Sequence, residues 1–134
     1  MKTFTISAIL FIACICLNAQ NLIGYKGAEI IKYMKANHRE MNYNRVVNKQ
    51  FNYLKYSDDS ESQTILFFLN ADSVCRNVKV IIDPEIKPGK VNELNALYTR
   101  SDNNRWIDRH GGKVYHIDLK DEKWSCVISY ETEK

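Results

Sequence analysis

Two histidines and two aspartates flank the Gly111-Gly112 pair, and side chains of these types bind metals or transfer protons. They are Asp108, His110, His116 and Asp118. If the two glycines form a hairpin turn, Asp108 lies opposite Tyr115 and His116 lies opposite Ile107. This register divides the histidines and acids between the two faces of the sheet, whereas zinc needs three or four converging ligands. We therefore expect neither a metal site nor a cofactor.

The same histidines support an alternative function, a small hydrolase in which His110 or His116 works with a nearby carboxylate. A Cys–His pair is disfavoured, because Cys126 is expected among core residues, where a thiol has a raised pKa and reacts poorly. The acid pairs Asp58-Asp59 and Asp121-Glu122 fall in turns, where acids are expected for backbone reasons. We assign no catalytic residue and favour a protein without enzymatic activity.

Cys75 and Cys126 are the cysteines that follow the first nineteen residues. In an oxidising compartment they could form a disulfide. Cys126 is expected on the core face of its strand, whereas Cys75 is out of phase with Val78 and its apolar neighbours. Side chains on opposite faces cannot meet the geometry of a bridge, unless a bulge near Asn77 restores the phase. A disulfide and two buried free thiols both remain open at this point.

Tyrosine is unusually common, with eight residues in 134. Protein interfaces favour tyrosine because its side chain is large and rigid with a polar tip. Together with the apolar residues beside them, two of these tyrosines predict an exposed binding surface. Its candidate residues are Phe51, Tyr53, Leu54 and Tyr56.

Apolar spacing and turn residues predict the order helix, three strands, helix, three strands. The first helix is expected within residues 24–41, followed by strands over 50–56, 63–69 and 74–83. The second starts at Pro88-Gly89 and ends before Ser101, and short strands follow around Trp106, over 114–119 and over 124–130.

Strands joined by short turns must be antiparallel. The expected fold class is therefore α+β, an antiparallel sheet of six strands with two helices packed on one face. Two helices of about 15 residues cover one face of such a sheet but not both. We expect the uncovered face to expose Leu54, Tyr56 and the strand over 65–69.

The last hairpin allows a register prediction. If Asp121-Glu122 is a two-residue turn, Leu119 faces Trp124, and the pairs that follow are also apolar. These are Ile117 with Cys126 and Tyr115 with Ile128. This face of the hairpin is therefore expected to lie in the core.

The first nineteen residues predict a secretory signal peptide. Lys2 is followed by an apolar run over 6–17, and Ala19 is the small residue that signal peptidase requires. Twelve residues of helix reach about 18 Å, which is too short to span a membrane. We expect cleavage after Ala19, export to the periplasm or the extracellular space, and one domain over residues 20–134. A lipoprotein, lipidated at Cys14 or Cys16, is the minor alternative.

Composition excludes several classes of function. Lys2 is the one charged residue before position 20, so the remaining 115 residues carry 18 Lys and Arg against 16 Asp and Glu. This balance is too even for a nucleic-acid-binding surface. No phosphate-binding loop, dinucleotide fingerprint, nucleophile elbow or zinc-protease motif occurs.

A family resemblance covers about residues 22–83. The segment from Gly24 to Ile30 resembles the Gly-x-[Ser/Thr]-x-x-x-[Val/Ile] helix start of small secreted modules, although Lys26 replaces the Ser or Thr. These are the β-lactamase-inhibitor-protein-like domains and the SmpA/OmlA-type outer-membrane lipoproteins. The strands that follow have the same order in this chain, but a second helix and three further strands come after them. The resemblance implies protein binding on a sheet surface without catalysis. The partner is expected to be another protein or a second copy of the chain.

Overall fold

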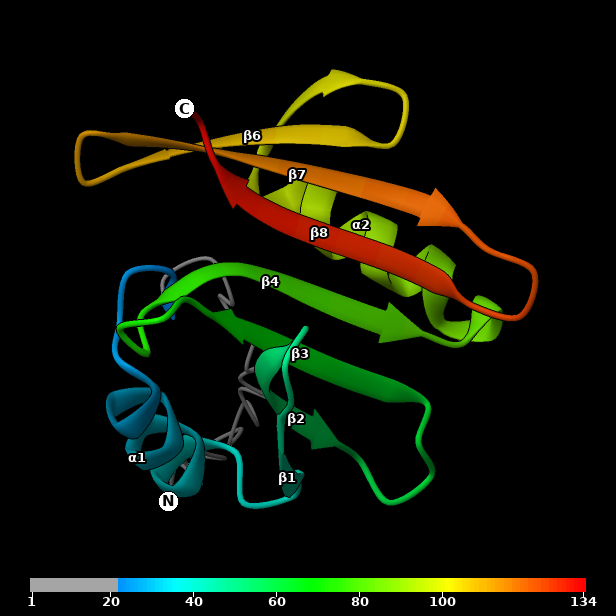
Figure 1. The fold of residues 1–134 in the computed structure, drawn as a ribbon. Helices are drawn as coiled ribbons and strands as arrows, with labels where there is room; N and C mark the ends of the chain where they lie inside the picture. The colour runs from blue at the N-terminus through cyan, green and yellow to red at the C-terminus, as the bar shows by residue number, and fades with distance from the viewer. Residues whose placement is uncertain (1–21) are drawn as a thin grey trace, which may run out of the picture.

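The computed structural model describes residues 22–134, and the expected signal peptide and its cleavage point lie outside this range. The fold is one antiparallel sheet of eight strands with two short α-helices (Figure 1). The first half of the described chain comprises α1 (Gly27–Asn37), β1 (Asn42–Val47), β2 (Asn52–Ser57), β3 (Gln63–Leu69) and β4 (Cys75–Ile82). The second comprises α2 (Lys87–Leu97), β5 (Thr99–Asp102), β6 (Arg105–His110), β7 (Lys113–Asp121) and β8 (Cys126–Thr132), with the 3-10 turn η2 (Pro84–Ile86) before α2.

The strand order β1-β2-β3-β4-β8-β7-β6-β5 shows how the two halves join. Each half is one helix followed by a four-stranded meander. The last strands of the two meanders, β4 and β8, pair antiparallel at the centre, where Val80 lies opposite Ile128. Strands β1 and β5 are therefore the two edges of the sheet.

The predicted fold class, a six-stranded α+β arrangement of order α-β-β-β-α-β-β-β, is wrong, because the sheet has eight strands and dominates the fold. The additional strands are β1 and β5. Strand β1 lies in the gap between the predicted first helix, within residues 24–41, and the predicted strand over 50–56, and β5 lies where the second helix was predicted to end. An edge strand pairs on one side and buries little, so it lacks the apolar alternation by which a strand is recognised. Every residue of β5 is exposed, and Val46 alone is partly buried in β1.

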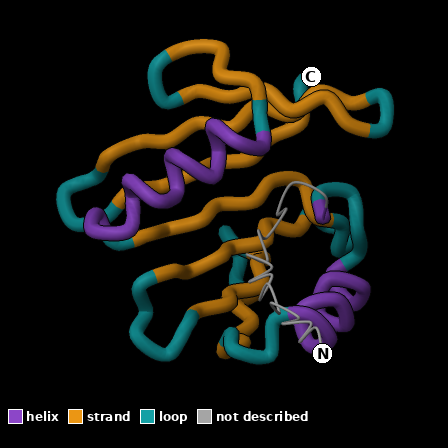
Figure 2. Tube along the Cα trace, turned by 180° about the vertical axis from the view of Figure 1, so that it is seen from behind, coloured by secondary structure: helices purple, strands orange, loops and turns teal. Residues whose placement is uncertain are grey.

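One row of side chains shows where the core lies. Paired positions on six neighbouring strands place these side chains in line across the sheet, and all of them are buried. They are Leu54, Phe67, Val78, Tyr130, Ile117 and Trp106. Ile30 and Met34 of α1 and Leu94 of α2 belong to the same core cluster, so both helices cover this face. Figure 2 shows α2 lying over the strands of the second half.

The register of one predicted hairpin is confirmed and that of the other is wrong. Around Gly111-Gly112, Asp108 lies opposite Tyr115 and Ile107 lies opposite His116, as predicted. In the last hairpin Leu119 lies opposite Ile128 rather than Trp124. The loop is longer than two residues, because β7 ends at Asp121 and β8 begins at Cys126. Trp124 lies in this loop and is 79% exposed. The shift is an even number of residues, so the other predicted side chains still face the core, whereas Trp124 does not.

Candidate functional site

The uncovered face of the first half carries a cluster of aromatic rings. Tyr53 on β2 lies opposite Phe68 on β3, with ring centroids 5.5 Å apart, and Phe51 lies 6.5 Å from Tyr53. Val46 on the edge strand extends the cluster, because it lies opposite Tyr53. Phe51 is 49% exposed, and the other three side chains are partly exposed. We call these four residues the aromatic patch.

Two lysines accompany the aromatic patch. Lys79 on β4 places its Nζ 5.8 Å from the centroid of the Phe68 ring, within reach of a cation–π contact. The next row across the sheet runs from Lys55 through Leu66 to Lys79. Neither lysine forms an ion pair within residues 22–134. The aromatic patch is thus bordered by positive charge.

Two of the four predicted binding residues are not on this surface, which corrects the prediction. Leu54 is fully buried and Tyr56 is 3% exposed, both on the face that the helices cover. The Leu54 side chain lies beneath the start of α1, 3.9 Å from the position that a Cβ on Gly27 would occupy. Alternation along β2 placed these two residues opposite Phe51 and Tyr53, but it did not show which face the helices cover.

Val46 and Phe68 are the patch residues that were not among the four predicted binding residues, although the strand over 65–69, which contains Phe68, was expected to be exposed. The strand over 65–69 is apolar throughout, so its alternation is hidden. The structure buries Ile65 and Phe67 and leaves Leu66 and Phe68 partly exposed on the other face. The neighbouring strand contains the signal that could have identified Phe68. Its residues alternate between the two faces, and Phe68 lies opposite Tyr53, so the two share a face.

The two candidate disulfide partners are free, buried thiols. A register shift between Phe68 and Leu69 turns Cys75 onto the same face as Val78. Cys75 nevertheless begins β4, whereas Cys126 lies opposite Ile82 at its other end. The two cysteines are therefore separated by about 23 Å along the strand, far beyond the reach of a disulfide.

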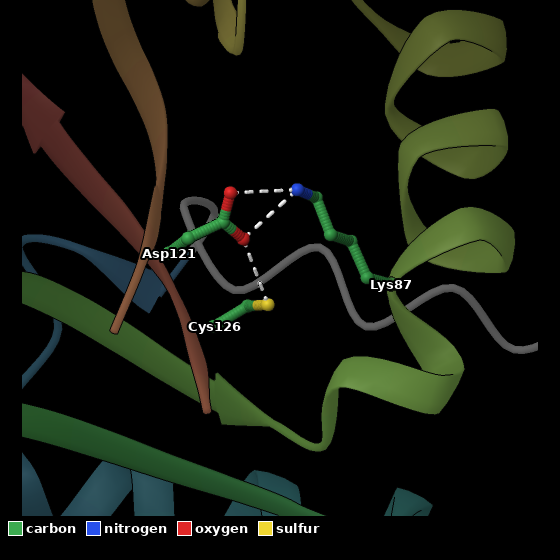
Figure 3. A network of polar contacts seen from close by, with 3 residues as sticks. All are labelled: Lys87, Asp121 and Cys126. Atoms are coloured by element: carbon green, nitrogen blue, oxygen red, sulfur yellow. Dashed lines mark hydrogen bonds and ion pairs between the residues drawn. The ribbon is translucent and has the colours of Figure 1, made fainter. Parts of the chain in front are cut away.

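Cys126 takes part in a polar network that resembles a catalytic arrangement (Figure 3). Lys87 Nζ donates to the two carboxylate oxygens of Asp121 at 2.8 and 2.9 Å, and Cys126 Sγ donates to Oδ1 at 3.2 Å. Burial and the neighbouring Asp121 carboxylate raise the pKa of the Cys126 thiol. A thiol held protonated is a poor nucleophile. The network instead connects the start of α2 to the β7–β8 hairpin.

The two candidate catalytic histidines lie at the surface. His116 Nε2 is 3.5 Å from Glu133 Oε1, and the two side chains are 42% and 57% exposed. His110 is exposed at the end of β6, next to the turn. On β8 the residue opposite His116 is Glu131, and Cys126 lies five residues from Glu131 along the strand. Cys126 is therefore about 17 Å from the position of His116. For the hydrolase alternative, the structure provides one histidine–carboxylate pair at the surface, His116 with Glu133, and no thiol among the described residues lies beside this pair.

Three further features of the chain bear on its function: metal binding, membrane-spanning helices and similarity to known proteins. No group of three or more His, Cys, Asp or Glu side chains within residues 22–134 could hold a metal ion. No helix in this range is long and apolar enough to cross a membrane. No protein-family model, curated protein or solved structure matches the chain.

Proposed function

We propose that this chain is an exported, non-enzymatic binding module that holds another protein against the uncovered face of β1–β4. The observation that carries the proposal is the aromatic patch on a sheet face that neither helix covers. Exposed aromatic rings with polar tips or charged neighbours are typical of protein interfaces. The earlier resemblance to secreted modules that bind proteins on a sheet surface points the same way.

Charge indicates what kind of protein fits. Strands β1–β4 contain Arg45, Lys55, Arg76 and Lys79 and no acidic residue. On the uncovered face, the lysines lie in the row adjoining the patch. Complementary potential favours a partner that presents apolar side chains surrounded by carboxylates.

The same charge disfavours self-association through this face. A two-fold dimer places the same patch on both sides of the interface. Lys55 and Lys79 would then face the lysines of the second copy, with no acidic residue from these strands to compensate. Like charges in an interface are costly, so we favour a partner of different sequence.

Site-specific photocrosslinking tests the proposal in cells that express the full chain. A p-benzoylphenylalanine at position 53 is compared with one at position 124, because Trp124 is also exposed and aromatic but lies in the distant β7–β8 loop. We expect one discrete adduct at position 53 and none at position 124. A companion Lys79→Glu change is expected to weaken the adduct, and raised salt to do the same.

Two results contradict the proposal. Equal crosslinking at positions 53 and 124 shows that the patch is not the binding surface. An adduct with twice the mass of the chain, insensitive to Lys79→Glu, shows self-association through this face instead of the proposed acidic partner.

A further inference from the structure

A second candidate site lies on the opposite side of the sheet from the aromatic patch. Between the end of α1 and the strands β1 and β2 is a cavity of about 350 Å³. Most of its wall is apolar, and the principal side chains are those of Met34, Met41, Tyr43 and Tyr56. The two tyrosine rings are 5.2 Å apart and form the sheet side of the wall. We call this the α1 cavity. Its volume is within the range of small-molecule sites.

The polar part of the wall is cationic. Lys35 and Arg39 line the cavity, and neither has an ion-pair partner in the described part of the chain. The C-terminal end of α1 contributes a partial negative charge of about one half. Glu40, whose carboxylate lies beside His38, adds one negative charge next to the wall. The two positive charges of Lys35 and Arg39 still exceed these negative charges, so the opening of the cavity attracts anions.

The third polar side chain in the wall is His38, which is 5% exposed. Its Nδ1 lies 3.2 Å from Glu40 Oε1. Two hydrogen bonds lower the pKa of the Glu40 carboxyl, the larger effect coming from a backbone N–H and the smaller from His38. An ionised carboxylate only accepts hydrogen bonds, so Nδ1 must carry a proton. Nε2 is then left over, buried and without a partner among residues 22–134.

An unsatisfied buried nitrogen beside a cavity indicates a missing hydrogen-bonding group. Nε2 accepts a hydrogen bond when the ring is neutral and donates one when the ring is protonated. A carboxylic head group suits both states, because it donates as the acid and accepts as the carboxylate. Neither an alcohol nor an ammonium group suits the wall as well, since neither compensates Lys35 and Arg39.

From these features we infer that the α1 cavity binds a small amphiphilic monocarboxylate, with its apolar body between α1 and the two tyrosines and its carboxylate toward Lys35, Arg39 and His38. The volume corresponds to about a dozen water-sized groups. A straight-chain acid such as decanoate has this number of non-hydrogen atoms. The inference is independent of the proposed protein interface, because the two sites occupy opposite faces of the sheet.

Amide chemical shifts of the protein purified after expression of the full chain provide the test. Decanoate is titrated below its micellar concentration, and decanol is the uncharged control. We expect decanoate to bind more tightly and to shift the amides of residues 31–43 and 56. The double variant Lys35→Gln/Arg39→Gln is expected to weaken decanoate binding roughly five- to tenfold and to leave decanol unchanged.

Two further variants locate the site. Lys55→Gln/Lys79→Gln also removes two positive charges, but from the uncovered face, and is expected to leave both titrations unchanged. Ile31→Trp places a large ring in the cavity wall and is expected to abolish binding of both probes while the remaining amide spectrum stays folded. The inference fails if decanoate does not bind, if decanol binds equally well, or if the shifts gather around Tyr53 and Phe68.

Discussion

Neighbouring tyrosines on one strand have opposite roles. The Tyr56 ring is buried against Phe67, 5.9 Å away, and its pKa is raised to about 12, chiefly by burial. The Tyr53 ring belongs to the aromatic patch, partly open to solvent. A charge introduced at these two positions therefore meets two different surroundings, although the positions are only three residues apart.

Aspartate substitutions separate the two roles. Tyr56→Asp loses aromatic packing worth about 3–5 kcal/mol and buries a charge, so we expect it to unfold the protein. Tyr53→Asp is expected to change the free energy of unfolding by no more than about 1 kcal/mol. Urea denaturation followed by circular dichroism measures both. If Tyr56→Asp keeps the wild-type midpoint, Tyr56 is not in the core.

The Lys87–Asp121 ion pair predicts a pH-dependent stability. Hydrogen bonds from Lys87 and then Cys126 lower the pKa of Asp121 below its ordinary value of 3.8. A lowered pKa means that the pair stabilises the fold above pH 3.8 and that this contribution disappears as Asp121 becomes protonated. The same hydrogen bond raises the pKa of Lys87 above 10.5, so the contribution also disappears at higher pH.

The variant Asp121→Asn tests this window. We expect it to be less stable than the wild type from about pH 4 to pH 10, with the difference closing outside these limits. Thermal melts at a series of pH values provide the measurement. Glu122→Gln is a nearby control, because the Lys120–Glu122 contact is longer, 3.5 Å, and largely exposed. A difference that persists unchanged at pH 3 would contradict the assignment.

At the scale of the elements, the sequence predicted what is buried better than what is exposed. Six strands and both helices could be located because the side chains that face the core, such as Ile117 and Val80, recur at regular spacing. The strands β1 and β5 have no such spacing, because they are the edges. The aromatic patch was half predicted, since alternation separates Tyr53 from Tyr56 but does not say which face the helices cover.

Helix α2 is held by few apolar contacts. Leu94 is its single buried residue, and Leu97 is 47% exposed. Polar contacts supplement this packing, since Trp106 Nε1 donates to Asn95 Oδ1 at 2.9 Å. Leu94→Ala is therefore expected to destabilise the protein by about 2–4 kcal/mol, whereas Leu97→Ala should cost less than about 1 kcal/mol. Equal urea midpoints for the two variants would show that α2 does not contribute to the core in this way.

At the scale of the whole molecule, the two halves differ in charge although they share one order of elements. Strands β1–β4 lack acidic residues, whereas β5–β8 include Asp102, Asp108, Asp118, Asp121 and Glu131. In the second half, Arg105 on the uncovered face is paired with Asp118 at 3.2 Å and Lys120 with Glu122 at 3.5 Å, whereas Arg109 on the same face forms no ion pair within residues 22–134. Strands β1–β4 therefore carry an excess of positive charge, whereas the acidic and basic residues of β5–β8 balance one another.

The core nevertheless runs without interruption through both halves. Val78 on β4 lies opposite Tyr130 on β8, and the buried row continues from there to Leu54 in one direction and Trp106 in the other. A seam of paired, buried positions at the centre of the sheet means that neither half can lose its strands without exposing the core of the other. We therefore expect one cooperative unfolding transition.

Two probes, one in each half, test this cooperativity. Burial raises the pKa of the Cys75 thiol in the first half to about 12, so it should react with a maleimide only after unfolding. Trp106 in the second half is 1% exposed, so the change in tryptophan fluorescence reports its exposure. In a Cys126→Ala background, pulse labelling and fluorescence should give the same urea midpoint. Labelling of Cys75 at urea concentrations where the fluorescence is still native would show that the first half opens alone, and that the β4–β8 pairing does not couple the two meanders.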